Sequence, residues 1–156
     1  MNAIKIRPAT RNDAECIVRF NAAIAQETEH ITLDLSRLRP GVDAVLNDPA
    51  KGFYIVAESE GCIVGQLMIT YEWSDWRNGM FWWIQSVYVD PVYRKQKIFS
   101  QLHRTIEQMA HNDGTVCGIR LYVERANTRA QTVYKNLGMH PTVYEMYETD
   151  YVMGRK

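Results

Sequence analysis

The sequence predicts an α/β protein: one mixed, mostly antiparallel sheet with helices on both faces. Its 156 residues, 46% hydrophobic, suit one domain over 1–156 with a substantial core. Stretches rich in β-branched and aromatic residues alternate with amphipathic helical stretches. The expected order, β-α-α-β-β-β-α-β-α-β, combines hairpins with strand-helix-strand crossovers, which is typical of a mixed sheet.

Charge and composition exclude several classes of protein. The 18 basic and 18 acidic residues cancel, so we expect no nucleic-acid partner. No apolar run has membrane-spanning length, and the N-terminus lacks the apolar core of a signal peptide. The three widely spaced cysteines indicate small buried apolar residues in a reducing cytoplasm. The four histidines lack metal-ligand spacing, so we expect no metal cofactor, no membrane partner and a cytoplasmic location.

The first third predicts one strand and two helical stretches. Ala3 to Arg7 forms a short strand, and Thr10 begins a helix in which Asp13 occupies the capping-box position. Helical spacing continues to about Gln26, and residues 27–30 are expected to form a polar loop.

Asp34 is expected to cap a second helical stretch that Pro40-Gly41 interrupts. Phe53 to Glu58 and Cys62 to Glu72 then predict two strands, joined by a tight turn at Glu60-Gly61. Gly65 indicates a bulge or a close backbone approach. Residues 73–79 are expected to form a loop.

The central unit is a strand, a basic turn and a helix. Ile84 to Val89 has the composition of a buried strand, which Asp90-Pro91 ends. Residues 93–97 form a basic turn, and an amphipathic helix starts near Ile98. Unpaired N–H groups and the helix dipole at such a helix start favour an anion. The unit therefore predicts a phosphate site.

The last third predicts a strand, a helix and a final strand. Val116 to Val123 should lie parallel to the strand ending at Val89, through a right-handed crossover. Asn127 is the expected N-cap of a helix that stops at Gly138. Pro141 to Val152 has strand composition and is expected to return to the sheet.

Two motifs resemble those of the GNAT (Gcn5-related) N-acetyltransferase family, and the likeness spans nearly the full chain. The family's acetyl-CoA motif is Gln/Arg-x-x-Gly-x-Gly/Ala, and residues 94–99 read RKQKIF. Arg94 and Ile98 match this motif, whereas Lys97 and Phe99 replace its glycines. The second motif is NTRAQTVYKNLGM at 127–139, with an asparagine, a tyrosine seven residues later and a Leu-Gly-Met ending.

The resemblance implies a GNAT-like acyl-CoA N-acyltransferase fold, with acetyl-CoA as co-substrate. The pantetheine arm would pair with backbone groups of one strand, and the diphosphate would lie on the turn and helix start. Backbone N–H groups come from any non-proline residue, whereas glycine matters where φ is positive or approach is close. The alternative is a solvated basic helix start with Phe99 in the core. The implied cofactor-binding residues are Val87, Tyr88, Val89, Arg94, Lys95, Gln96, Lys97, Ile98, Phe99, Ser100 and Asn127.

Tyr134 is the catalytic residue that the resemblance implies, as the acid that protonates the departing CoA thiolate. A phenol pKa of about 10 and a thiol pKa of about 8.5 are close enough for this transfer in a water-poor site. The alternative is a buried tyrosine with a satisfied hydroxyl.

The general base and acceptor pocket stay open. Many relatives carry an acid at the positions of Gln85 or Tyr122, and this chain has neither. A nearby carboxylate, a water relay or an acceptor that arrives neutral would each suffice, and each carboxylate alone has the alternative of a solvated surface charge. Acids beside aromatic rings would suit a cationic amine, although aromatic residues in strands commonly belong to the core. The candidate substrate-binding residues are Glu27, Glu29, Trp82, Tyr122 and Glu124.

These expectations combine into one functional hypothesis. The chain is interpreted as an acetyl-CoA-dependent N-acetyltransferase that acetylates a primary amine of a small molecule by direct attack in a ternary complex. A homodimer is one expected assembly. The alternatives are a peptide or protein N-acetyltransferase, a non-catalytic CoA- or metabolite-binding module, and a resemblance of fold alone.

Overall fold

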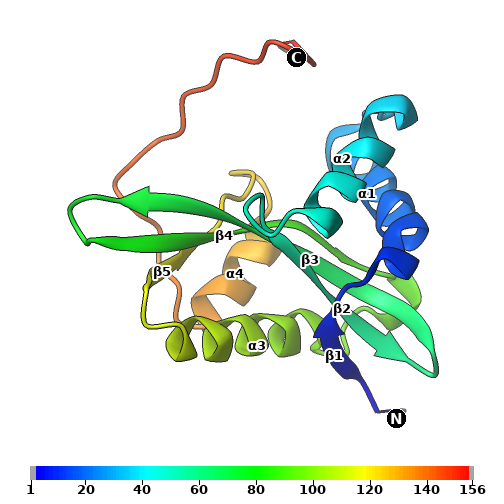
Figure 1. Ribbon diagram of the computed structural model, residues 1–156, viewed down its shortest axis with the longest axis horizontal. Helices are drawn as coiled ribbons and strands as arrows, with labels where there is room; N and C mark the ends of the chain where they lie inside the picture. The colour runs from blue at the N-terminus through cyan, green and yellow to red at the C-terminus, as the bar shows by residue number, and fades with distance from the viewer. Residues whose placement is uncertain (1–2, 155–156) are drawn as a thin grey trace. The chain divides into compact units, whose positions relative to one another are not determined.

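The computed structural model describes residues 3–154 and contains two compact units, divided between Tyr122 and Val123. The first unit contains the sheet and three helices, and the second contains one helix and the C-terminal tail (Figure 1). A single domain over the whole chain stays a prediction.

The sheet of the first unit has five strands in the order β1-β2-β3-β4-β5. The first four pair antiparallel in sequence, and β5 pairs parallel to β4. The mixed, mostly antiparallel sheet and its parallel crossover are therefore confirmed. The strands are β1 (Lys5–Pro8), β2 (Phe53–Ser59), β3 (Cys62–Ser74), β4 (Gly79–Val89) and β5 (Val116–Arg120).

Helices cover both faces of this sheet, with α1 and α2 on one side and α3 on the other (Figure 1). Strand alternation supplies both faces, because Tyr54 packs with the cluster of α1 and α2 while its neighbour Ile55 packs with the cluster of α3. The helices are α1 (Ala14–Glu29), α2 (Leu35–Asn47) and α3 (Ile98–Asn112), with short 3₁₀ turns η1 (Arg11–Asp13) and η2 (Pro91–Tyr93).

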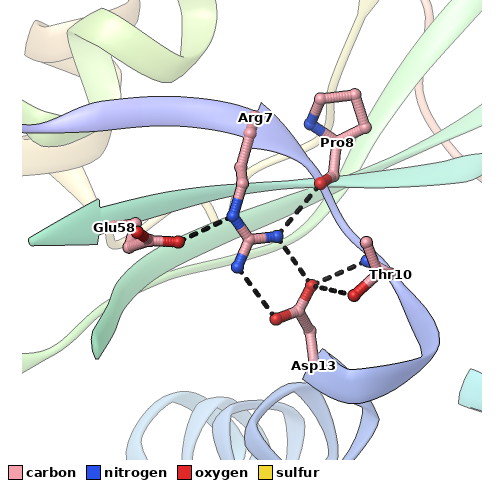
Figure 2. Close-up of polar contacts among 5 residues, drawn as sticks. All are labelled: Arg7, Pro8, Thr10, Asp13 and Glu58. Carbon is pink, nitrogen blue, oxygen red and sulfur yellow. Dashed lines mark hydrogen bonds and ion pairs between the residues drawn. The ribbon is translucent and has the colours of Figure 1, made fainter. Parts of the chain in front are cut away.

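A polar cluster fixes β1 to β2 and to η1 (Figure 2). Arg7 donates from Nε to Glu58 at 2.7 Å and from Nη1 and Nη2 to Asp13 at 2.8 and 3.0 Å. The Thr10 N–H donates to Asp13 at 2.6 Å, which confirms the predicted capping acid. The Arg7 hydrogen bonds keep the pKa of Asp13 below its usual value, although burial opposes them.

Two helical expectations are wrong. Residues 27–29 are helical, because α1 continues until His30 adopts a left-handed conformation with φ 56°. Pro40-Gly41 does not interrupt α2, although proline removes one backbone hydrogen bond. Packing compensates, since Val42 is 2% exposed in the cluster shared with α1, and Asp34 caps the helix by accepting from the Ser36 N–H.

The β3–β4 hairpin is longer than predicted. Strands replace part of the expected loop 73–79 and leave a turn at residues 75–78, because β3 continues to Ser74 and β4 begins at Gly79. The close approach at Gly65 is confirmed, since an added Cβ would lie 3.1 Å from Ile98 Cγ2 and 3.2 Å from Tyr88 O. At the sheet's far edge, β5 ends at Arg120, short of the predicted Val123.

The second unit contains α4 (Thr128–Asn136) with the predicted ends. Asn127 accepts from the Ala130 N–H at 3.0 Å, and Gly138 follows the helix at φ 85°. The predicted strand at 141–152 is wrong: the tail forms no strand in its described part, because strand composition alone supplies no ladder partner. Its exposed large apolar side chains are Val143, Tyr144, Met146, Tyr147, Tyr151, Val152 and Met153. No helix within residues 3–154 combines the length and apolarity that a bilayer crossing needs.

Candidate active site

The turn between β4 and α3 adopts an unusual backbone. As predicted, β4 stops at Val89, and Asp90 then accepts from the Val92 N–H at 3.0 Å. Two residues of this turn have positive φ, Lys95 at 66° and Lys97 at 59°. Non-glycine residues rarely adopt this left-handed conformation.

Lys97 explains why a glycine is expected at its position. It is the N-cap residue of α3 in a left-handed conformation, which costs a non-glycine residue about 1–2 kcal/mol. The chain therefore keeps the backbone shape that suits glycine while placing a cation there. First-turn N–H groups of an α-helix have no acceptor within the helix, so the start of α3 can bind an anion.

The side chains of Ile98 and Phe99 face the core side of α3. Ile98 is 2% exposed, and Phe99 packs against the same core cluster with its ring 6.0 Å from that of His103. The turn and first helical residue thus offer their main chain, with Lys95, Gln96 and Lys97 exposed in front of them. Ser100, in the same turn of helix, is partly exposed.

Arg94 connects this turn to β4 and α1. Its Nε donates to the Val89 carbonyl at 2.9 Å, and its Nη2 lies 2.7 Å from Glu27 Oε2. The Tyr88 hydroxyl donates to the other Glu27 oxygen at 2.9 Å, and the guanidinium lies 5.5 Å from the Tyr88 ring. Burial raises the pKa of Glu27, but hydrogen bonds from Arg94 and Tyr88 outweigh it and keep this carboxylate ionised.

The strand β4 bends immediately before the expected pantetheine-binding residues. Ser86 has φ 50°, and the β3–β4 register shifts between Gln66 and Met68. Gln66 is fully buried and donates to Asn21 at 2.8 Å and to the Ser86 carbonyl at 3.1 Å. This polar contact holds the bulge in place.

Past the bend, one edge of β4 has no partner in β5. The β4–β5 pairing ends at Trp83 and Arg120, whereas β4 continues to Val89. Val87, Tyr88 and Val89 therefore present backbone groups on an edge to which an extended ligand can add as a strand.

The expected acceptor residues lie in different environments. Trp82 is 6% exposed and packs edge-on against Phe53 at 5.3 Å, so its ring belongs to the core. Tyr122 is 61% exposed, with its ring 6.1 Å from that of Trp83. Glu29 and Glu124 are exposed.

Gln85 occupies the position on this strand where the family resemblance implies an acid, and its amide donates to the Thr70 hydroxyl. Gln85 thus takes part in a cross-strand hydrogen bond and cannot act as a base.

The second unit supplies Asn127 and Tyr134. Asn127 fills the predicted role of helix cap. Tyr134 lies on α4, and burial raises the pKa of its phenol. This hydroxyl therefore keeps its proton at neutral pH.

Two observations concern metals and thiols. Within residues 3–154, no three His, Cys, Asp or Glu side chains gather as metal ligands. All three cysteines are free thiols. The expectation that they are buried is wrong, because Cys62 is exposed and Cys16 and Cys117 are partly exposed.

Sequence reasoning missed the Ser86 bend and the contact of Glu27 with Arg94. No local pattern marks Ser86, because serine is not a residue that positive φ favours. Glu27 and Arg94 are 67 residues apart, so only the fold brings them together. The polar Gln66 within an apolar strand was the one available signal of a buried hydrogen-bond network.

An open strand edge beside an anion-binding helix start can accept an extended ligand that carries a diphosphate, and CoA-dependent acyltransferases are a class of protein with such a ligand. Residues 20–139 match the family model described as Acetyltransferase (GNAT) family, so the chain belongs to that family.

Solved structures and a curated relative agree with this assignment. A structure described as "a possible acetyltransferase from Clostridium difficile 630" has 46% identity and a TM-score of 0.89, covering 96% of this chain and 98% of that one. Thialysine N-epsilon-acetyltransferase from Bos taurus is 35% identical over 78 residues, which span 49% of this chain and 44% of the bovine protein.

The aminoglycoside acetyltransferase AAC(6')-Iy, solved with the bisubstrate analogue CoA-S-monomethyl-acetylneamine, shares 14% identity at a TM-score of 0.75. The match covers 95% of this chain and 98% of that one. At this identity the likeness shows the fold alone. The family and fold that the sequence motifs indicate are both confirmed.

Proposed function

We propose that this protein is an N-acetyltransferase that moves the acetyl group of acetyl-CoA to a primary amine of a small molecule. The observation that carries the proposal is the left-handed turn at Lys95 and Lys97, leading into α3 beside the open edge of β4. The turn and helix start suit the diphosphate, and the edge at 87–89 suits the amide groups of pantetheine.

The proposed reaction is direct attack within a ternary complex. The amine nitrogen forms a bond to the thioester carbon, the carbon–sulfur bond breaks, and the sulfur takes the phenolic proton of Tyr134. The raised pKa of this phenol keeps the proton available at neutral pH. The proton lost by the amine goes to a nearby carboxylate or to water, and the Tyr134 phenolate then regains a proton from solvent.

A cationic amine fits the acidic residues proposed for the acceptor side. Glu27 and Glu29 end α1, and the exposed ring of Tyr122 is suited to an ammonium group. The bovine relative, named as a thialysine N-epsilon-acetyltransferase, supports this substrate class. The peptide or protein N-acetyltransferase is the alternative, with an extended acceptor.

One assay tests the proposal. The protein is incubated with acetyl-CoA and lysine, thialysine, a polyamine, an aminoglycoside or a short peptide, and release of free thiol is followed. Thiol release with a small amine is the expected result. Release with the peptide alone would favour the alternative, and CoA binding without release would leave a binding module.

We also propose a cytoplasmic homodimer. Three free thiols suit a reducing compartment. Seven large apolar side chains between residues 143 and 153 are exposed, and a second copy would cover them.

A further inference from the structure

Glu27 and Arg94 form a contact that the proposed reaction does not use in its present form. Arg94 belongs to the turn proposed for the diphosphate, yet its Nη2 is directed at Glu27, 2.7 Å away. The two sides of the guanidinium have different partners. The Nε donates to the Val89 carbonyl, which leaves Nη2 for an anion. Glu27 is held in turn by the Tyr88 hydroxyl at 2.9 Å.

Both members of this ion pair remain accessible to a ligand. The side chain of Arg94 is 37% exposed and that of Glu27 is 42% exposed. Exposed ion pairs are weak, whereas an arginine binds a phosphate through charge-assisted and often bidentate hydrogen bonds. A diphosphate carries more charge than one carboxylate, so it is the stronger partner for this guanidinium.

The remaining cations of the turn are placed differently. Among residues 3–154, neither Lys95 nor Lys97 forms an ion pair within the chain, so an incoming diphosphate meets no competing carboxylate at these residues. Of these three cations, only Arg94 must give up a carboxylate of the chain, that of Glu27, to bind the diphosphate.

Resting on the proposed function, we propose that Glu27 and the coenzyme diphosphate compete for Arg94. Binding of the coenzyme displaces Glu27, and the carboxylate then has no cationic partner at the end of α1. The released carboxylate becomes the anion that receives a cationic acceptor amine. Coenzyme binding thereby prepares the acceptor side.

If Glu27 competes with the coenzyme for Arg94, removing its charge should raise CoA affinity. If Glu27 instead holds Arg94 in place for the coenzyme, removing its charge should lower CoA affinity. Glu27→Gln removes the charge but keeps an oxygen that can accept from Tyr88. If Glu27 competes, the variant binds CoA about two- to fivefold more tightly, which is the range for an exposed ion pair. If Glu27 only orients Arg94, the variant binds CoA more weakly.

The experiment is a calorimetric titration of the full chain with CoA. Glu15→Gln is the matched control, because Glu15 is on the same helix and pairs with Arg39 away from the turn. We expect this control to bind CoA like the wild type. In an Arg94→Gln background, Glu27→Gln should no longer change CoA affinity, because the group for which they compete is gone.

The outcomes separate this inference from the proposed function. A wild-type protein that does not bind CoA removes both. A wild-type protein that binds CoA, with Glu27→Gln unchanged or weaker, removes the inference and leaves the proposed function. A tightening that persists in the Arg94→Gln background also overturns it, because Glu27 would then act on another group.

Discussion

At the scale of single residues, Lys97 separates backbone shape from side-chain charge. Its φ of 59° is a conformation that glycine adopts without strain. Lys97→Gly and Lys97→Ala both remove the charge, so their difference reports the backbone alone. We expect the glycine variant to be the more stable by up to about 1 kcal/mol in urea denaturation.

Gln96 provides the control for Lys97, because it lies on the same exposed turn without positive φ. There the order should reverse, with Gln96→Ala more stable than Gln96→Gly, since glycine loses more backbone entropy on folding. The same order at both positions would show that Lys97 carries no strain.

Tyr134 is a second residue whose role can be isolated. Tyr134→Phe keeps the ring in its half-buried place on α4 and removes the proton that the proposed reaction needs. We expect turnover to fall by about 10²-fold or more, with CoA affinity nearly unchanged. Steady-state thiol release and a CoA titration measure the two quantities, and unaltered turnover would exclude Tyr134 from the mechanism.

At the scale of elements, the sequence predicted whatever depends on local pattern. The order of helices and strands up to α4 is confirmed, because apolar spacing and turn residues determine it. It did not predict where β3 ends and β4 begins, since these two strands continue for as long as each finds its partner. The tail at 141–152 has strand composition but finds no partner strand, and it therefore forms no strand.

The candidate site follows the same division. The helix start at Ile98 and the edge at 87–89 were predictable from pattern and resemblance, and their geometry suits the proposed ligand. The bend at Ser86 depends on hydrogen bonds that join β3, β4 and α1, and Trp82 lies in the core because it packs with Phe53 of β2 and with the α3 cluster. Such contacts between distant segments leave no local signal.

The link between β1 and η1 should make stability depend on pH. Arg7 lowers the pKa of Asp13 in the folded state, so the folded protein favours the ionised carboxylate. This contribution is complete above the unfolded pKa of about 3.9 and is lost as pH falls through the lower folded value. Asp13→Asn should therefore cost about 1–3 kcal/mol at pH 7, and the difference should shrink below about pH 4.

Urea denaturation of the wild type and Asp13→Asn at pH 7, 5 and 3.5 measures this dependence. Asp43→Asn is a suitable control, because Asp43 is exposed on α2 and forms no ion pair within residues 3–154. A difference between wild type and Asp13→Asn that is constant with pH would show that the charge of Asp13 does not contribute.

At the scale of the whole molecule, the apolar tail bears on assembly. A chain with zero net charge has little electrostatic repulsion to keep copies apart, and its tail exposes Val143 and Tyr147 to 93% and 90%. If the tail forms the proposed dimer contact, the full chain should sediment as a dimer. Truncation after Pro141 should give a monomer in which the sheet and its three helices persist.

A substitution tests the same point without removing chain. Val143→Ser with Tyr147→Ser takes two large apolar side chains out of the contact, so the dimer should dissociate at concentrations where the wild type remains paired. Trp76→Ser is the matched control, since Trp76 is 86% exposed in the β3–β4 turn. A dimer that weakens equally with Trp76→Ser would implicate apolar exposure in general. A dimer that survives both the truncation and the double substitution would have its contact on the sheet or helices. The surfaces of those elements would then have to supply the buried interface area in place of the tail.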